Sequence, residues 1–460
     1  MVWLPGEGFD FADARQFDGT YLASLANVIV ITVQYRVGVF GFLKTDSEAP
    51  GNMGIWDQLE ALDWIKKNAK AFGGDSDNIT LFGRFTGSMS ISILLTSPKL
   101  RSGHDYDLPL FKRAILFSGI AVGNWVFENE SQKISKKFLE SIHCQNETLS
   151  CLHKVSVDEI LEKASFGWKP TFDGELITEE PLEALKNGNF ADNIAEVMFG
   201  INEIEGSLCL LNHFAAKTKY YDLIIDNKLT ENDVMEMIQD DMKMFFSKNF
   251  DNNYHNKILI SSIFNKNHNI SLREKYMEFC SSLFIGSHMK SFNKLLVKRQ
   301  LENQSKANMT LTKTFNYQFQ HRPTFSIAPS FINSAIHGDD VLFAFGLAHS
   351  LPIIHDEDEK ITNYFIKSLS NFAYYGNPNG RLNGKWSQHE MMMIKSDEFP
   401  NEKEVVYQTY LFSSTVEILL TFLTASTTVL ALVTTSLILF LVVYMFKQRH
   451  STLKKGQSLL

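Results

Sequence analysis

The feature that most constrains the fold is a pair of glycines, Gly83 and Gly87, between an apolar strand and an apolar helix. Residues 79–82 are typical of a buried strand, and the helix is expected to run to about residue 95. Glycines at this spacing permit a sharp strand-to-helix turn. The residue at its centre is Phe85, whose ring has neither a lone pair nor a proton to give up and therefore cannot attack a carbonyl.

Other apolar segments place this turn in an α/β architecture. Residues 28–35, rich in β-branched side chains, and residues 114–118 are typical of strands buried on both faces of a parallel sheet. A helix is predicted over residues 55–71, and strand patterns return at 314–319 and 404–407. This alternation of strands and helices predicts an α/β fold with a mostly parallel sheet.

Composition excludes some classes of function. The chain has 460 residues, of which 44% are hydrophobic and 21% charged, and this is globular composition. Its net charge of −8 argues against a nucleic-acid partner, because a phosphate backbone requires clustered basic side chains. No pattern predicts a cofactor.

Cysteine spacing argues against a metal site and leaves a disulfide open. The four cysteines include no C-x-x-C pair, so zinc is not expected. Cys144 and Cys151 lie close enough in sequence to close a short disulfide loop that carries a glycosylation sequon; two unpaired thiols are the alternative.

Six N-x-S/T sequons precede the longest apolar segment and together favour the lumen of the secretory pathway. Asn78 directly precedes a predicted buried strand and is the least suited to carry a glycan. The five expected glycosylation sites are Asn129, Asn146, Asn269, Asn303 and Asn308.

The segment 418–446 has the composition of a membrane-spanning helix. It contains 29 residues and no charge, whereas about 20 residues suffice to cross a bilayer. Basic residues follow at once, so residues 447–460 are predicted to be a cytoplasmic tail and 411–417 an extracellular stalk. The alternatives are a buried helix, disfavoured by length, and a removed lipid-anchor signal, disfavoured by the charged tail. We expect a type I plasma-membrane protein with its large N-terminal region outside the cell.

Local motifs spread along residues 1–410 resemble the type-B carboxylesterase/cholinesterase family, which also includes the non-catalytic neuroligins. Residues 2–9 (VWLPGEGF) resemble the family's V-W-I-H-G-G-G-F loop, and residues 35–43 (YRVGVFGFL) its Y-R-x-G-x-x-G-F-L segment. Residues 51–58 and 371–386 are similar to two further family signatures. The resemblance implies an α/β-hydrolase fold, with helices on both faces of a mostly parallel central sheet.

The resemblance also assigns positions to a catalytic site. In this fold the triad follows the order nucleophile, acid, base. Phe85 stands at the nucleophile position, G-x-N-x-x-E-G carries the acid position onto Glu205, and H-G-x-[DE] carries the base position onto His337. The expected oxyanion-hole positions are Gly6, Glu7 and Thr86, and the Cys144–Cys151 loop fits a disulfide position of the family.

The departures from the family pattern predict an inactive site. The family's G-E-S-A-G reads G-R-F-T-G here, so Arg84 replaces an acid and Phe85 replaces the serine. The oxyanion loop has Pro5 in place of histidine and Glu7 in place of glycine, and a carboxylate there would oppose the developing negative charge. We interpret these as three independent lesions. Phe85 implies either a relaxed turn or strain borne by packing, and Glu205 and His337 are expected to persist as a buried pair.

We therefore expect a membrane-anchored, non-catalytic domain that binds a protein partner or a hydrophobic ester. The alternative is an active carboxylic ester hydrolase with an unrecognised nucleophile. Since the family has a long segment before the strand at residues 2–4, we also expect that the sequence is truncated at its N-terminus.

Overall fold

A computed structural model describes most of residues 1–395. Residues 396–460 are outside the described part, together with internal segments at 46–47, 102–105, 108, 123–125, 129, 146–147, 165, 192–193, 217, 247–269, 304–311, 352–353, 382–385 and 387–390. The predicted strand at 404–407, the stalk, the membrane segment at 418–446 and the tail all lie outside the described residues. Among the helices that are described, none is both long and apolar enough to cross a membrane.

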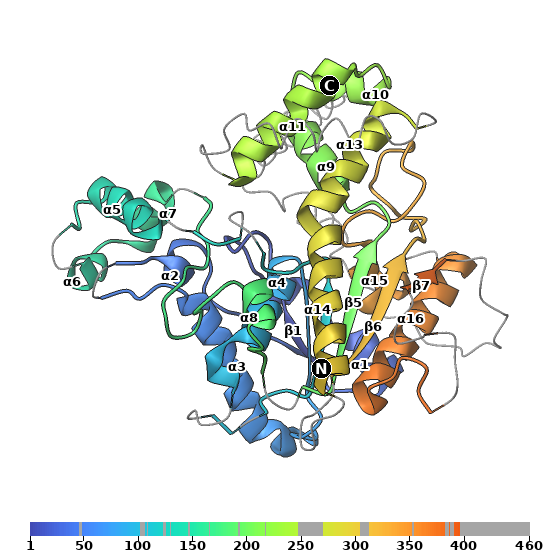
Figure 1. The fold of residues 1–460 in the computed structure, drawn as a ribbon, viewed down its shortest axis with the longest axis horizontal. Helices are drawn as coiled ribbons and strands as arrows, with labels where there is room; N and C mark the ends of the chain where they lie inside the picture. Colours follow the sequence, from blue (N-terminus) through green and yellow to red (C-terminus); the bar gives the residue numbers. More distant parts are fainter. Residues whose placement is uncertain are drawn as a thin grey trace, which may run out of the picture.

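A seven-stranded sheet forms the centre of the described structure, in the order β2-β1-β3-β4-β5-β6-β7 (Figure 1). Every neighbouring pair is parallel, as predicted. The strands are β1 (Val2–Leu4), β2 (Ile31–Thr32), β3 (Thr80–Arg84), β4 (Arg113–Phe117), β5 (Glu196–Asn202), β6 (Lys313–Phe319) and β7 (Met391–Ile394).

Strand lengths depart from the sequence pattern mainly at the edge. The apolar run at residues 28–35 forms only the two paired residues of β2, and both are half-exposed. In the middle of the sheet, β3 continues to Arg84, beyond the predicted end at residue 82. The register pairs Leu4 with Gly83 and Gly83 with Leu116, so the carboxyl ends of β1, β3 and β4 lie side by side.

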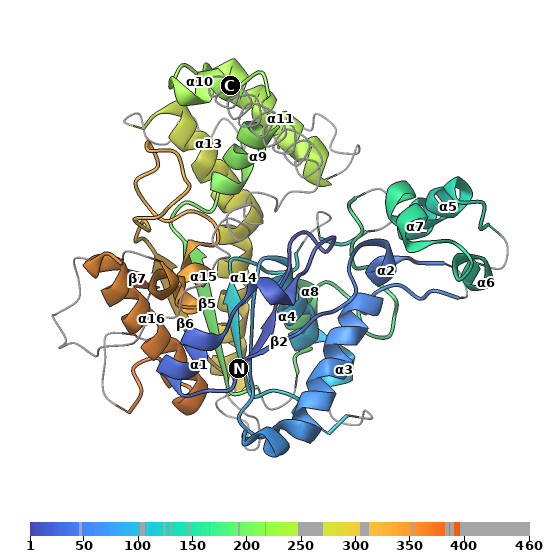
Figure 2. The ribbon, with the colours of Figure 1, turned by 180° about the vertical axis from the view of Figure 1, so that it is seen from behind.

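Helices cover both faces of the sheet (Figures 1 and 2). Alternate strand residues enter two separate apolar cores, as the period of a strand requires: Leu81 joins the core beneath α3, α4, α8 and α14, and Phe82 the core beneath α1, α15 and α16. These helices are α1 (Thr20–Ala26), α3 (Met53–Asn68), α4 (Thr86–Thr96), α8 (Pro181–Lys186), α14 (Ser287–Asn303), α15 (Asp339–Ala344) and α16 (Asp356–Tyr375).

The remaining helices form peripheral groups that extend beyond the sheet (Figure 1). One group surrounds the disulfide between Cys144 and Cys151, which confirms the predicted pairing. A second group stands above the carboxyl end of β5. The peripheral helices are α2 (Gly38–Phe42), α5 (Ser131–Ser141), α6 (Thr148–Leu152), α7 (Val157–Lys163), α9 (Ser207–Ala215), α10 (Tyr221–Ile225), α11 (Glu231–Phe246) and α13 (Leu272–Ser281).

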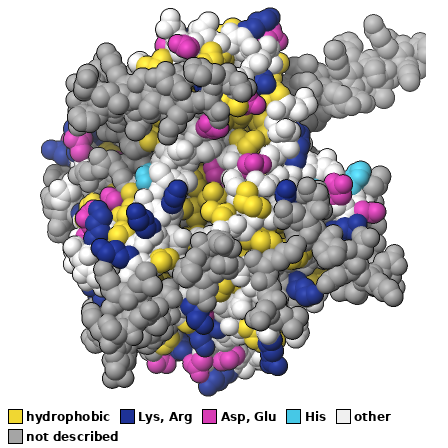
Figure 3. Space-filling model, turned by 45° about the vertical axis from the view of Figure 1, so that its right-hand side comes forward, with side chains coloured by type: hydrophobic (Ala, Val, Ile, Leu, Met, Phe, Trp, Pro, Cys, Tyr) yellow, Lys and Arg dark blue, Asp and Glu magenta, His cyan; other side chains and the backbone are white. Residues whose placement is uncertain are grey.

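The surface has no uniform sign of charge on the face drawn in Figure 3. Basic and acidic side chains are interspersed there among apolar ones.

The helix predicted over residues 55–71 is α3, which begins at Met53 and continues after Asn68 as a 3₁₀ turn, Ala69–Phe72.

Candidate active site

The turn between β3 and α4 keeps a strained backbone. Phe85 has φ 49° and ψ −113°, a sparsely populated region that costs about 1–3 kcal/mol. The flanking glycines are required by packing, because a β-carbon at Gly83 would stand 2.9 Å from the Gly87 carbonyl carbon, and one at Gly87 would overlap the Leu4 carbonyl. All residues of α4 are buried. Of the two sequence-based alternatives for Phe85, the structure supports strain held by packing.

Glu205 and His337 form the buried pair that the resemblance implies. His337 Nδ1 lies 2.6 Å from Glu205 Oε2, and the two side chains are only 4% and 2% exposed. The other carboxylate oxygen accepts hydrogen bonds from the Ser118 hydroxyl at 2.6 Å and the Asn202 backbone N–H at 2.5 Å. These bonds fix the carboxylate, which in turn orients the imidazole.

Phe85 packs against the imidazole of His337. The two ring centroids are 5.3 Å apart and the planes meet at 81°, an edge-to-face arrangement. Phe85 is 6% exposed. The Nε2 atom of His337 is buried and has no hydrogen-bond partner among the described residues. The structure thus brings Phe85, Glu205 and His337 together.

Nearby hydroxyl groups are engaged elsewhere. Thr86 Oγ1 accepts a hydrogen bond from the Phe9 N–H at 3.4 Å, and Ser88 Oγ donates to the Gly119 carbonyl at 2.6 Å. Ser207 Oγ accepts from the backbone N–H of His337 at 3.0 Å. In the described part of the chain, no hydroxyl is therefore bonded to the imidazole of His337.

The loop after β1 lies against the start of α4, and one of its expected oxyanion donors has a partner within the loop. A β-carbon at Gly6 would overlap Gly87 and Thr86, so Gly6 is needed for this close approach. The N–H of Glu7 donates to the Phe11 carbonyl at 2.9 Å. That donor is consequently used inside the loop and is not directed at a ligand.

Arg84 and Glu7 form an ion pair next to this loop. The Arg84 side chain is 3% exposed and that of Glu7 is 18% exposed. The guanidinium also occupies the space where a β-carbon at Gly338 would stand, directly after His337. The expectation that the substitutions at 84 and 7 are independent lesions is wrong, because each charge is the partner of the other.

Further acidic groups surround the guanidinium. Burial lowers the pKa of Arg84 to about 10, although Asp340, Glu205 and Asp339 favour its charged form. Burial raises the pKa of Asp339 to about 8 and that of Asp340 to about 6. Asp340 accepts hydrogen bonds from Asn202 Nδ2 at 3.0 Å and from the Tyr317 hydroxyl at 2.7 Å. The base of the site is therefore a polar network with partly compensated charge.

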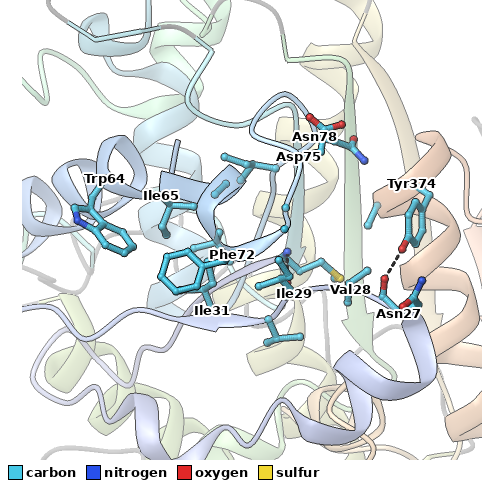
Figure 4. A pocket seen from close by; sticks show the side chains of 18 residues that line it. Asn27, Val28, Ile29, Ile31, Trp64, Ile65, Phe72, Asp75, Asn78 and Tyr374 are labelled. Carbon is cyan, nitrogen blue, oxygen red and sulfur yellow. Dashed lines mark hydrogen bonds between the residues drawn. The ribbon is translucent and has the colours of Figure 1, made fainter. Parts of the chain in front are cut away.

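A cavity of about 510 Å³ lies at the other end of the sheet (Figure 4). Met1 and Val2, at the start of β1, line it, whereas Phe85 follows the carboxyl end of β3. Its walls are mostly apolar, with Trp64 and Phe72 among them, and Tyr374 donates a hydrogen bond to the Asn27 carbonyl at its border. This cavity is separate from the Glu205–His337 pair.

The sequence model of the carboxylesterase family matches residues 1–409. The chain belongs to the carboxylesterase family. Its parallel sheet, with helices on both faces, fits the α/β-hydrolase fold.

Relatives of this carboxylesterase-family chain include enzymes. It is 28% identical over 426 residues to acetylcholinesterase 1 of Caenorhabditis elegans, which covers 84% of this chain and 63% of the relative. It is 29% identical over 408 residues to carboxylesterase 5A of Mus musculus, covering 85% and 65%. Acetylcholinesterase of Electrophorus electricus is 28% identical over 430 residues, covering 84% and 64%. The chain thus spans slightly less than two thirds of the length of these relatives.

Most of the expected glycosylation sites are in segments that the structure does not describe. Asn129, Asn146, Asn269 and Asn308 lie outside the described residues, and Asn303 ends α14 without a described side chain. Asn78, the sequon considered least suited to a glycan, accepts a hydrogen bond from Arg113. These five sites remain predictions.

Sequence reasoning did not assign the residues that hold the acid in place. Ser118 lies in a stretch that resembles the family's Q-S-G strand end, and this likeness was the available signal. Asn202, in the G-x-N-x-x-E-G motif, binds both Glu205 and Asp340. Nothing in the sequence pattern predicted the contact between Arg84 and Glu7, which are 77 positions apart.

Proposed function

We propose that this chain is a non-catalytic member of the carboxylesterase family, in which residues 1–410 form a recognition or ligand-binding domain. The observation that carries the proposal is the edge-to-face contact of Phe85 with His337. In a working triad the base takes a proton from a hydroxyl or thiol nucleophile. Here an aromatic hydrocarbon stands at the nucleophile position and packs against the imidazole.

The oxyanion loop supports the same proposal. Acyl transfer requires N–H donors directed at the oxygen that becomes negative. The N–H of Glu7 instead donates to Phe11, and the Glu7 carboxylate pairs with Arg84. The nucleophile is thus replaced by an aromatic packing contact, and one of the expected donors is used in a hydrogen bond within the loop.

The proposed role is binding at a cell surface, in the manner of the neuroligins. The apolar segment 418–446, the basic residues after it and the sequons before it support a type I plasma-membrane protein with an extracellular domain. The proposed ligand of the extracellular domain is a protein partner or a hydrophobic ester that is bound and not hydrolysed.

An ester-hydrolysis assay tests the proposal. The full chain, purified in detergent, is given p-nitrophenyl butyrate beside the His337→Ala variant and an active carboxylesterase. We expect both forms of this chain to show the same background rate, because no nucleophile depends on His337. A wild-type rate well above that of His337→Ala would contradict the proposal.

A further inference from the structure

Three helices above the carboxyl end of β5 bring metal-ligating side chains together at a point outside the Glu205–His337 pair (Figure 1). Cys209 lies on α9, Asp241 on α11 and Cys280 on α13. The two sulfur atoms and a carboxylate oxygen lie within 4.8 Å of one another, and all three residues are buried. Both cysteines are reduced.

A histidine on the same helix as Cys209 lies beside this cluster. His213 follows Cys209 by four positions, so the two side chains share one face of α9. His213 Nε2 lies 3.7 Å from Asp241 Oδ1, and the side chain is 93% buried (7% exposed). This nitrogen has no hydrogen-bond partner among the described residues. A buried nitrogen without a described hydrogen-bond partner, 3.7 Å from a carboxylate of this cluster, is an arrangement that a cation would satisfy.

Two neighbouring residues orient the ligating side chains. Thr218 Oγ1 lies 3.2 Å from His213 Nδ1, and when it accepts the Nδ1 proton, Nε2 presents its lone pair to the cluster. The Tyr276 hydroxyl donates a hydrogen bond to Asp241 Oδ2, which leaves Oδ1 on the side of His213. Outer partners of this kind are a regular feature of metal sites.

We propose that Cys209, His213, Asp241 and Cys280 form a tetrahedral binding site for Zn²⁺. Thiolate, imidazole and carboxylate are the ligands that zinc takes, usually four at a time. On a zinc tetrahedron, neighbouring ligand atoms are roughly 3.3–3.8 Å apart. The ligand atoms of Cys209, Asp241 and Cys280 already lie within 4.8 Å of one another, and His213, 3.7 Å from the Asp241 carboxylate, would have to turn towards the two sulfur atoms on binding.

Cys209 and Cys280 are both free thiols in this structure. Coordination of Zn²⁺ forms two zinc–sulfur bonds and releases two protons to solvent. With two thiolates, one carboxylate and a neutral imidazole, the loaded site has a net charge of −1.

The expectation of no metal site rested on the lack of a C-x-x-C pair, but these ligands come from three helices.

A zinc ion at this site would link helices α9, α11 and α13 next to the segment that contains Glu205. Helix α9 begins at Ser207, two residues after Glu205, and the Ser281 hydroxyl, next to Cys280, accepts a hydrogen bond from the Gly206 N–H at 2.7 Å. A bound zinc ion would therefore hold α11 and α13 against the segment that carries the acid.

Metal analysis and cobalt substitution of the full chain test the site. The wild-type protein is stripped with a chelator and reloaded with Zn²⁺ or with Co²⁺ as a spectroscopic probe. We expect one equivalent of metal, a thiolate-to-cobalt absorption band, and a fall in Tm when zinc is removed. These measurements use wild-type protein and do not depend on the folding of a variant.

Matched variants locate the metal. Cys209→Ser should weaken the cobalt–thiolate band, because only the Cys280 thiolate remains, and Thr218→Val, which removes only an outer partner, should weaken zinc affinity by about 10–100-fold. His349→Gln is the control, because His349 is equally buried but bonds to Asn363 in another part of the fold. Absence of a stoichiometric metal, an unchanged cobalt spectrum in Cys209→Ser, or a Cys209–Cys280 disulfide found by mass spectrometry would each overturn the proposal.

Discussion

Arg84, at the end of β3, forms an ion pair with Glu7 in the loop after β1, and its guanidinium lies against Gly338, the residue after His337. The family resemblance places an acid at position 84 and a glycine at position 7. The negative charge is thus on the loop and the positive charge is on the strand. The pair links the altered loop to the strand that precedes Phe85.

Restoring the serine alone is expected to restore little activity. Phe85→Ser supplies a hydroxyl near His337, but the Arg84–Glu7 pair and the Glu7–Phe11 hydrogen bond still hold the loop. The triple variant Phe85→Ser/Arg84→Glu/Glu7→Gly should exceed the single variant by about 10²-fold or more in kcat/KM, the usual value of an oxyanion donor. Hydrolysis of p-nitrophenyl butyrate checks this. Equal activity in the two variants would show that the loop is already competent.

Removing either partner of the Arg84–Glu7 pair should lower the free energy of unfolding, and the two effects should not be additive. Arg84→Met leaves a carboxylate without its partner, and Glu7→Gln leaves a guanidinium that is only 3% exposed. Each change should lower the free energy of unfolding by about 2–3 kcal/mol, somewhat less than for fully buried pairs because Glu7 keeps some exposure.

The double variant Arg84→Met/Glu7→Gln should lower the free energy of unfolding, measured with denaturant, by less than the sum of the two single changes. Arg15→Met is the control, since Arg15 pairs with Asp13 on the surface and should contribute little. Additive effects at positions 84 and 7 would argue against the pair.

The buried acids should make the protein less stable as the pH rises. Burial raises the pKa of Asp339 to about 8, above its value of about 4 in an unfolded chain, so the folded state binds the proton more tightly. Its contribution is therefore complete at low pH and is lost as the pH rises towards 8. Asp339→Asn, whose amide oxygen can still accept from the Ile336 N–H, should reduce the decline in unfolding free energy between pH 5 and 8.

Asp13→Asn is the control for that slope. The Arg15 side chain lowers the pKa of Asp13, so its contribution is lost on acidification and not between pH 5 and 8. A slope for Asp339→Asn that equals the wild-type slope would show that Asp339 is ionised throughout this range.

The disulfide should stabilise the peripheral helices α5 and α6. Closing a loop as short as that between Cys144 and Cys151 is worth about 2–3 kcal/mol in the chain-entropy account. Reduction with dithiothreitol should lower the unfolding free energy of the wild type by that amount and leave the double Cys144→Ser/Cys151→Ser variant unchanged. A reductant effect of equal size in the double variant would place its origin elsewhere.

Much of the site could be predicted because it depends on local motifs. The Gly83–Gly87 turn and the Glu205–His337 pair are each specified by a short glycine-containing pattern. No short sequence pattern predicts the contacts between distant segments. The Arg84–Glu7 pair forms because β1 and β3 are sheet neighbours, and the Cys209 cluster forms where α9, α11 and α13 meet. Strand β2 is shorter than its apolar run because it lies at the edge of the described sheet.

Labelling with a fluorophosphonate probe would show whether the site contains a nucleophile, since the probe bonds covalently to an activated hydroxyl at a serine-hydrolase site. The wild-type full chain is treated with the probe beside an active carboxylesterase and then digested for mass spectrometry. With Phe85 against the imidazole of His337, we expect no labelled residue in the native protein. A single serine or threonine labelled in the wild type, and unlabelled in His337→Ala, would contradict the account.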